Sequence, residues 1–258
     1  MSESENDPSR AIVAMLALNS EKMPKPSAVV NALKLRLPDG PEPEDIEGED
    51  GTITFHLGSW IAAISMMPIP IPWSELEGPC ATAWWWPDAT DEMRHHKNHI
   101  IIALMGEDES LLSRHIVLSQ LVAALATITD TVGVYWGAGG LVHEPAEFIE
   151  QCDDLTIENS LPHLWVDLRV EENDDGSLCF FTTGLEAFDQ FEMEIERSNQ
   201  SAEEILDLCY SVVHYLISSG AQIQDGESVG RTGEERVPVT HRPSKWDADR
   251  TVLSLEFH

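Results

Sequence analysis

Three consecutive tryptophans, Trp84–Trp86, restrict how this chain can fold. They close a stretch, residues 67–87, that holds four of the eight tryptophans and five of the fifteen prolines. Successive side chains of a helix or a strand point in different directions, so the three rings cannot all face one core. At least one ring is therefore expected in a groove or on a contact surface. The prolines are expected to lead this stretch out of the sheet.

The rest of the composition is typical of a globular protein. With 258 residues, of which 42% are hydrophobic, the chain can bury a large core as one domain or as two packed halves. Disorder is expected only in loops and in a tail over residues 1–10. The four cysteines form no Cys-x-x-Cys pair and are expected to be reduced structural thiols: Cys80, Cys152, Cys179 and Cys209.

Charge restricts the partners. Acidic residues outnumber basic ones by 46 to 15, a net charge of −31. Such a surface repels nucleic-acid phosphates and anionic membranes, so neither is an expected partner. It favours a basic protein partner, or serves solubility alone. The acidic start of the chain lacks the basic region of a signal peptide, and no apolar run is expected to approach a membrane span, so the protein is expected to be cytoplasmic.

Apolar patterning predicts strands and helices in alternation. In the first part of the chain, strands are expected at residues 11–18, 52–57, 60–66, 99–105 and 131–136. Helices are expected from Pro26 to before Pro38, over 109–129 and over 146–152. The Pro-rich acidic segment 41–50 is predicted to be an exposed loop.

The polar segment 153–160 is the expected boundary between two halves. Beyond it, a hairpin is expected over 163–170 and 177–183, a strand over 191–196 and a helix from Ser201 to Gly220. Short strands are expected at 226–230, 235–241 and 250–257. The predicted class is α+β, with mixed sheets and helices packed on one face, in halves 11–155 and 161–258 that form one compact unit. The similar content of the halves suggests a duplicated ferredoxin-like unit.

Two segments resemble sites without completing a motif. His95 and His99 are four residues apart, which on a helix would place both imidazoles on one face, as in a metal pair. The carboxylate of a His-Glu-x-x-His motif is missing, and Arg94 and Lys97 would repel a cation. A polar helix end before a buried strand is the simpler interpretation, so no metal site is assigned.

His143 follows the glycine-rich turn at residues 137–140, which could present backbone amides to an anion. The Lys-Ser/Thr pair of a phosphate loop is absent, and Glu144 occupies the place of the phosphate. A tight turn that needs glycine dihedral angles explains the segment equally well. No nucleophile motif or cofactor signature is present, so no catalytic residue and no cofactor are predicted, and an enzymatic role is less expected than a binding role.

Several segments occur in an order that resembles the bacterial domain-of-unknown-function 4261 family. They are Pro70–Pro79, Ala83–Pro87, Gly133–Gly139, His163–Asp167 and Phe181–Leu185. The resemblance extends from about residue 50 to the end. It implies a stand-alone cytosolic protein, with a loose association to toxin–immunity contexts, and it supplies no catalytic residues.

Two functions remain open. The first is a non-catalytic acidic binding protein, such as an immunity or inhibitor protein, that neutralises a basic protein partner. The second is a small-molecule enzyme or ligand-binding protein with an aromatic and histidine pocket. The candidate binding residues for both are Trp73, Glu77, Trp84, Trp85, Trp86, Tyr135, Trp136 and His143.

Overall fold

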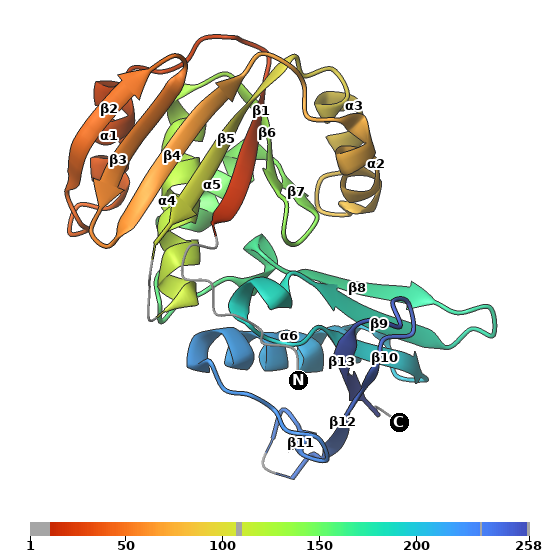
Figure 1. The fold of residues 1–258 in the computed structure, drawn as a ribbon. Helices are drawn as coiled ribbons and strands as arrows, with labels where there is room; N and C mark the ends of the chain where they lie inside the picture. The colour runs from red at the N-terminus through yellow and green to blue at the C-terminus, as the bar shows by residue number, and fades with distance from the viewer. Residues whose placement is uncertain (1–10, 107–109, 233, 257–258) are drawn as a thin grey trace. The chain divides into compact units, whose positions relative to one another are not determined.

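A computed structural model gives the fold and describes residues 11–106, 110–232 and 234–256 (Figure 1). The tail expected over residues 1–10 lies outside this range. The chain divides into two units, residues 1–159 and 160–258. Both contain helices and β-sheet, so the predicted α+β class is confirmed.

The first unit is built on a seven-stranded sheet with the order β2-β3-β4-β5-β1-β6-β7. Every neighbouring pair in it is antiparallel. Its strands are β1 (Ile12–Leu18), β2 (Pro43–Glu49), β3 (Thr52–Leu57), β4 (Trp60–Met67), β5 (Asn98–Met105), β6 (Thr131–Trp136) and β7 (Leu141–His143). Its helices are α1 (Pro26–Arg36), α2 (Trp73–Thr82), α3 (Ala89–Met93), α4 (Leu111–Ile128) and α5 (Pro145–Asp153).

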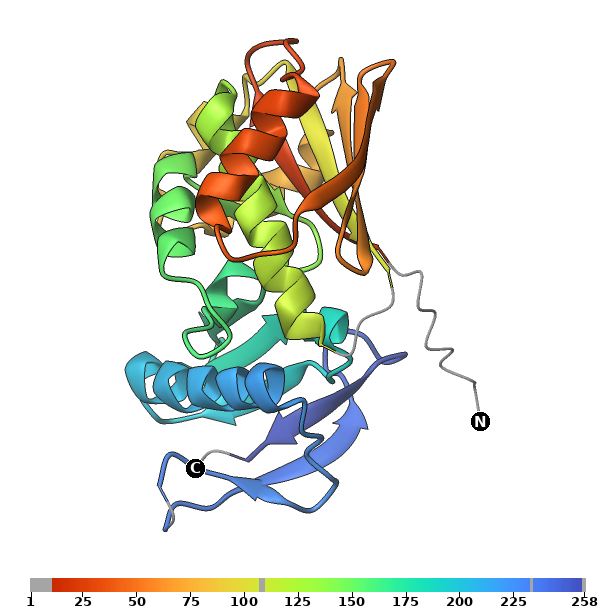
Figure 2. The same ribbon diagram turned by 90° about the vertical axis from the view of Figure 1, so that its left-hand side faces the viewer.

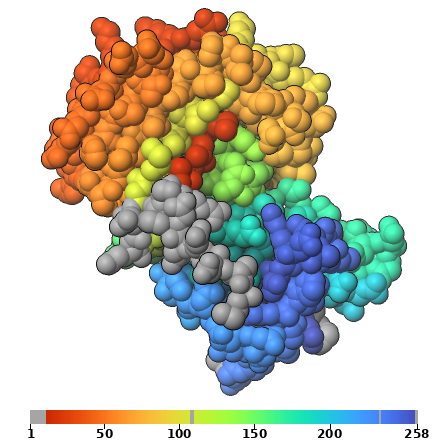
Figure 3. Space-filling view, in the orientation of Figure 1, coloured from red at the N-terminus to blue at the C-terminus, as the bar shows by residue number. Residues whose placement is uncertain are grey.

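Helices cover both faces of this sheet. Figure 2 shows α1, α4 and α5 together on one face. Helices α2 and α3 pack on the other face, where their side chains meet Ala17 of β1, Tyr135 of β6 and Val142 of β7. The expectation that all helices share one face is therefore wrong, because the proline-rich stretch forms a helix that the sequence did not indicate. The rest of this second face, over β2–β5, lies at the surface (Figure 3).

Helix α4 is the core helix of the first unit. Its 18 residues have a mean hydropathy of 1.6, so by length and composition it could cross a membrane. The expectation that no apolar run approaches that length is therefore wrong. However, 78% of the helix is buried, which is typical of a helix packed inside a globular unit.

The second unit has a six-stranded sheet with the order β11-β12-β13-β10-β9-β8. Strands β10 and β13 are parallel, and the other neighbouring pairs are antiparallel. Its strands are β8 (Asp167–Glu172), β9 (Leu178–Thr183), β10 (Met193–Ser198), β11 (Ser228–Val229), β12 (Val237–Pro243) and β13 (Thr251–Leu255). Helix α6 (Ala202–Ser219) packs against β8 and the short 3-10 helices η1 (Pro162–Leu164) and η2 (Leu185–Phe188).

Three further differences from the sequence predictions have physical causes. The acidic segment expected as a loop contains β2, an edge strand whose residues after Pro43 are all exposed, so no apolar alternation marks it. The strand expected from His163 begins only at Asp167, because Pro162 opens a 3-10 turn first. The two sheets differ in strand number and order, so the described residues give no duplicated unit.

Candidate binding surface

Helix α2 presents one buried face and one acidic face. Leu76 and Cys80, one turn apart, are its buried residues. Glu77 is exposed between them. The Tyr135 hydroxyl lies below this helix in the sheet, and its pKa is raised by burial and by the negative charge of Glu75.

A hydrophobic cluster fixes α2 and α3 to the sheet. Trp86 belongs to it and is only 4% exposed. Gly133 of β6 leaves the room that this ring needs, because a Cβ atom there would lie 3.1 Å from the Trp86 ring. The other buried members are Ala17, Ile71, Leu76, Cys80, Ala83, Ala89, Met93, Tyr135 and Val142. Trp86 is therefore a core residue of the first unit.

The three consecutive tryptophans lie in three different environments. Trp84 is 80% exposed, and its ring meets the Trp85 ring edge-on at a centroid distance of 5.6 Å. Trp85 is half-buried, and its indole N–H donates a hydrogen bond to the Val142 carbonyl oxygen at 3.0 Å. Trp84 is thus the ring that lies outside the core, while Trp85 covers the backbone of the edge strand β7.

The buried histidines of this region hold the backbone of the proline-rich stretch. The amide of Ile71 donates to Nε2 of His96 at 2.7 Å, so the other ring nitrogen, Nδ1, carries the hydrogen and donates to the Met93 carbonyl at 2.6 Å. Desolvation lowers the pKa of His96. His99 bonds to the Ile69 carbonyl through Nδ1 at 2.8 Å.

The helical pair of His95 and His99 is not formed. Helix α3 ends at Met93, so His95 lies exposed in a turn while His99 is buried in β5. The described residues contain no group of three His, Cys, Asp or Glu side chains that could hold a metal ion. The sequence pointed to His95 and His99 as a pair and not to His96. His96 binds the backbone amide of Ile71, which is 25 positions away, so no local pattern marks it.

The remaining candidates do not meet in one place. Tyr135 and Trp136 are neighbours in β6 and face opposite sides of the sheet. Tyr135 joins the Trp86 cluster, whereas the Trp136 ring lies 6.0 Å from the His115 ring of α4. His143 is buried, with its ring 6.3 Å from Trp85 and 5.3 Å from Phe148 of α5.

The ring of Trp73 makes a cation–π contact with an arginine side chain. The Arg94 guanidinium lies over the Trp73 ring, with its central carbon 4.6 Å from the ring centroid. An arginine over an indole face is attracted by the ring quadrupole. This role of Arg94 could not be predicted from the sequence, because the two side chains are 21 positions apart and no local pattern links them.

Trp84 is flanked by two acidic helices. We call the Trp84 surface the exposed Trp84 ring together with the exposed carboxylates of Glu75, Glu77, Asp88, Asp91 and Glu92. Figure 1 shows α2 and α3, which carry most of these residues, side by side next to β7. The surface combines a large apolar ring with negative charge, and such a combination suits a cationic side chain.

Comparison with known proteins gives one match. No curated protein and no solved structure matches the chain. The model of the family described as Domain of unknown function (DUF4261) matches residues 181–256. This segment runs from β9 to the end of β13. The resemblance to the domain-of-unknown-function 4261 family is thereby confirmed over residues 181–256, within the second unit.

Proposed function

We propose that the protein is a non-catalytic binding protein that neutralises a basic protein partner, in the manner of an immunity or inhibitor protein. The observation that carries this proposal is the Trp84 surface. Trp84 is 80% exposed in the segment between two helices that carry exposed carboxylates, so its ring has no role in the core of its own unit, whereas Trp86 is buried there.

The energetics suit a basic partner. A Lys or Arg side chain over an indole ring contributes about 0.5–1 kcal/mol at an exposed site and about 2 kcal/mol when it is desolvated. Tryptophan is also among the residues whose truncation costs most at protein interfaces. The net charge of −31 would steer a basic protein toward this chain and accelerate association.

The pocket of aromatic and histidine side chains has less support as a site. It would need Tyr135, Trp136 and His143 around one cavity, and the first two side chains point to opposite faces of the sheet. No observation on these residues favours a small-molecule reaction, so this alternative is not proposed.

The test is affinity capture from a lysate of the source organism by the tagged full-length protein, with washes at low and then moderate salt. We expect one basic protein in equimolar amount, released by salt because screening weakens long-range attraction. Titration calorimetry with that protein should then show at least about tenfold weaker binding by Trp84→Ala.

Trp246→Ala is the matched control, since Trp246 is 47% exposed and lies in the other unit. It should bind as the unchanged protein does. Trp86→Ala is unsuitable as a probe, because it would disrupt the core instead. If neither salt nor Trp84→Ala changed the affinity of the complex, the proposal would be ruled out.

A further inference from the structure

The second unit carries a groove beside α6 that the proposed function does not use. Its volume is about 700 Å³, within the range of ligand sites in proteins. The buried side chains of Val212 and Ile223 contribute apolar lining, and Tyr215, 52% exposed, contributes an aromatic side chain. Residues 226–230, which include β11, also line it. All these residues lie within the segment that matches the family model.

The strand in this groove has an unpaired outer edge. β11 is the last strand of its sheet and pairs only with β12 among the described strands. Ser228 stands opposite Pro238, which has no N–H. On one side of this pair the Val239 amide donates to the Glu227 carbonyl, and on the other side Val229 is in register with Val237. In an antiparallel ladder this geometry turns the N–H and C=O of Ser228 to the outer side of the strand. An extended peptide can pair with such an edge.

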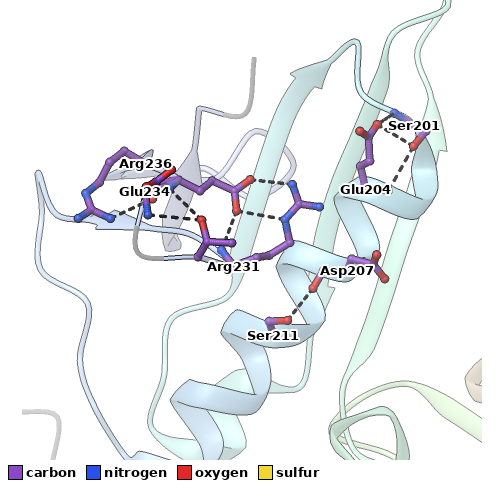
Figure 4. Close-up of polar contacts among 9 residues, drawn as sticks. Ser201, Glu204, Asp207, Ser211, Arg231, Glu234 and Arg236 are labelled. Atoms are coloured by element: carbon purple, nitrogen blue, oxygen red, sulfur yellow. Dashed lines mark hydrogen bonds and ion pairs between the residues drawn. The ribbon is translucent and has the colours of Figure 1, made fainter.

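An arginine without a carboxylate partner also lines the groove. Arg94 lies over Trp73, and six other arginines pair with carboxylates: Arg36, Arg169, Arg197, Arg231, Arg242 and Arg250. Within the described chain, Arg236 instead donates to the backbone carbonyl of Glu235 at 3.0 Å. Arg231 donates to the Glu235 carboxylate at 2.7 Å, and Figure 4 shows Arg236 extending away from Arg231 on the other side of the same loop.

This contrast points to an anionic ligand group. Acidic residues outnumber basic ones about threefold in this chain, so an arginine left without a carboxylate has a charge available to a ligand. Glu227 also lines the groove, and its carboxylate accepts a hydrogen bond from the Gln224 amide at 2.8 Å. That negative charge would disfavour a ligand with several acidic groups.

We propose that the groove between α6 and β11 binds a short extended peptide that carries one carboxylate. The peptide backbone pairs with Ser228, an apolar side chain rests on Val212, Ile223 and Tyr215, and the carboxylate meets Arg236. The carboxylate is either the C-terminus of the peptide or a single Asp or Glu side chain. This site is in a different unit from the Trp84 surface, so either proposal can fail without the other.

The test uses the full-length protein and an array of random-sequence synthetic peptides with free C-termini, followed by fluorescence anisotropy on the peptides retained. We expect Arg236→Gln to weaken binding about tenfold, the loss of one charge-assisted hydrogen bond. N-methylation of one peptide amide should abolish binding if the peptide forms a strand. C-terminal amidation and Asp→Asn or Glu→Gln changes in the peptide distinguish the two sources of the carboxylate.

Two variants serve as controls. Arg197→Gln removes the same charge from an exposed position of the same unit and should leave the affinity unchanged. Trp84→Ala should do so as well. The proposal would be overturned if the unchanged protein retained no peptide more strongly than the Arg236→Gln variant does. It would also be overturned if neither Arg236→Gln nor N-methylation of the peptide changed the affinity.

Discussion

At the scale of single residues, the core around Gly133 has no room for a side chain. A Cβ atom there would lie 2.1 Å from Sδ of Met93. We therefore expect Gly133→Ala to destabilise the first unit by about 1–3 kcal/mol, the usual cost of overpacking. Urea unfolding measures this loss. Because Met93→Ala removes the clash, the double variant should lose less than the two single variants together.

Gly78 gives the matched control for this experiment. It lies on the exposed face of α2, and a Cβ atom there would meet nothing within 4 Å. Gly78→Ala should stabilise the helix by up to about 1 kcal/mol. If Gly133→Ala stabilised the protein as much as Gly78→Ala does, the close contact between Gly133 of β6 and Met93 of α3 would be contradicted.

Glu192 makes the stability of the second unit depend on pH. This buried carboxylate accepts hydrogen bonds from the Thr182 hydroxyl at 2.6 Å and the Gly184 amide at 2.8 Å, yet burial raises its pKa above 4.5. The folded state thus holds this proton more tightly than the unfolded state. Its contribution to stability is complete below the unfolded pKa and is lost as pH rises through the folded pKa.

The expected result is a slope with a definite sign. Between about pH 4 and about pH 7, the free energy of unfolding of the unchanged protein should fall relative to that of Glu192→Gln. Urea unfolding of both proteins across this range gives the difference. Glu196→Gln, at an exposed position of β10, should show no such trend. If the free energy of unfolding of the unchanged protein instead rose with pH relative to that of Glu192→Gln, the hydrogen bonds to the Glu192 carboxylate would outweigh its desolvation.

At the scale of elements, the N-terminus of α6 is the clearest case of local sequence deciding structure. The Ser201 hydroxyl accepts a hydrogen bond from the Glu204 amide at 3.3 Å, and the Glu204 carboxylate accepts one from the Ser201 amide at 3.0 Å (Figure 4). Ser201→Ala should cost about 1 kcal/mol in urea unfolding. Ser218→Ala, at an exposed position of the last turn, should cost nothing measurable. Equal losses would remove the cap as the cause.

Local sequence patterns of this kind explain which helices and strands could be predicted. Helices α4 and α6 and strands β1, β3, β4, β5 and β9 carry long apolar patterns or caps, and all were predicted. Strand β2 was missed because its partner β3 supplies the backbone bonds while its own side chains are exposed. Helix α2 was missed because prolines surround it and Pro79 lies inside it, so its stability depends on packing beneath Leu76 and Cys80.

The candidate surface was predictable in place but not in detail. The sequence indicates that three adjacent tryptophans must separate, but it does not say which ring is buried. That choice depends on Gly133, which is distant in sequence and whose missing side chain leaves room for the Trp86 ring. In the same way, the contact of Arg94 with Trp73 depends on the turn between α2 and α3.

At the scale of the whole molecule, charge is spread over both units. Residues 1–159 contain 26 acidic and 8 basic residues, a net charge of −18, and residues 160–258 contain 20 and 7, a net charge of −13. Repulsion within each unit opposes folding. Raising the salt concentration from about 0.01 M to about 0.15 M shortens the screening length from about 30 Å to about 8 Å, so the melting temperature should rise.

Differential scanning calorimetry in sodium chloride and in potassium chloride measures this effect. The two salts should raise the melting temperature equally, because screening depends on ionic strength and not on the identity of the cation. A rise in one salt alone would indicate a specific ion site. An unchanged melting temperature in both would show that existing ion pairs already relieve the repulsion.

All four cysteines are buried, which gives this chain a use in the laboratory. Burial raises the pKa of Cys80 to about 11 and that of Cys152 to about 12, and it raises that of Cys209 as well, so these three thiols stay protonated in the folded protein. A thiol reagent can then react only after a segment opens. Cys80 and Cys152 report on the first unit, Cys179 and Cys209 on the second. Mass spectrometry of labelled peptides would thus time the opening of each unit separately, with no engineered probe.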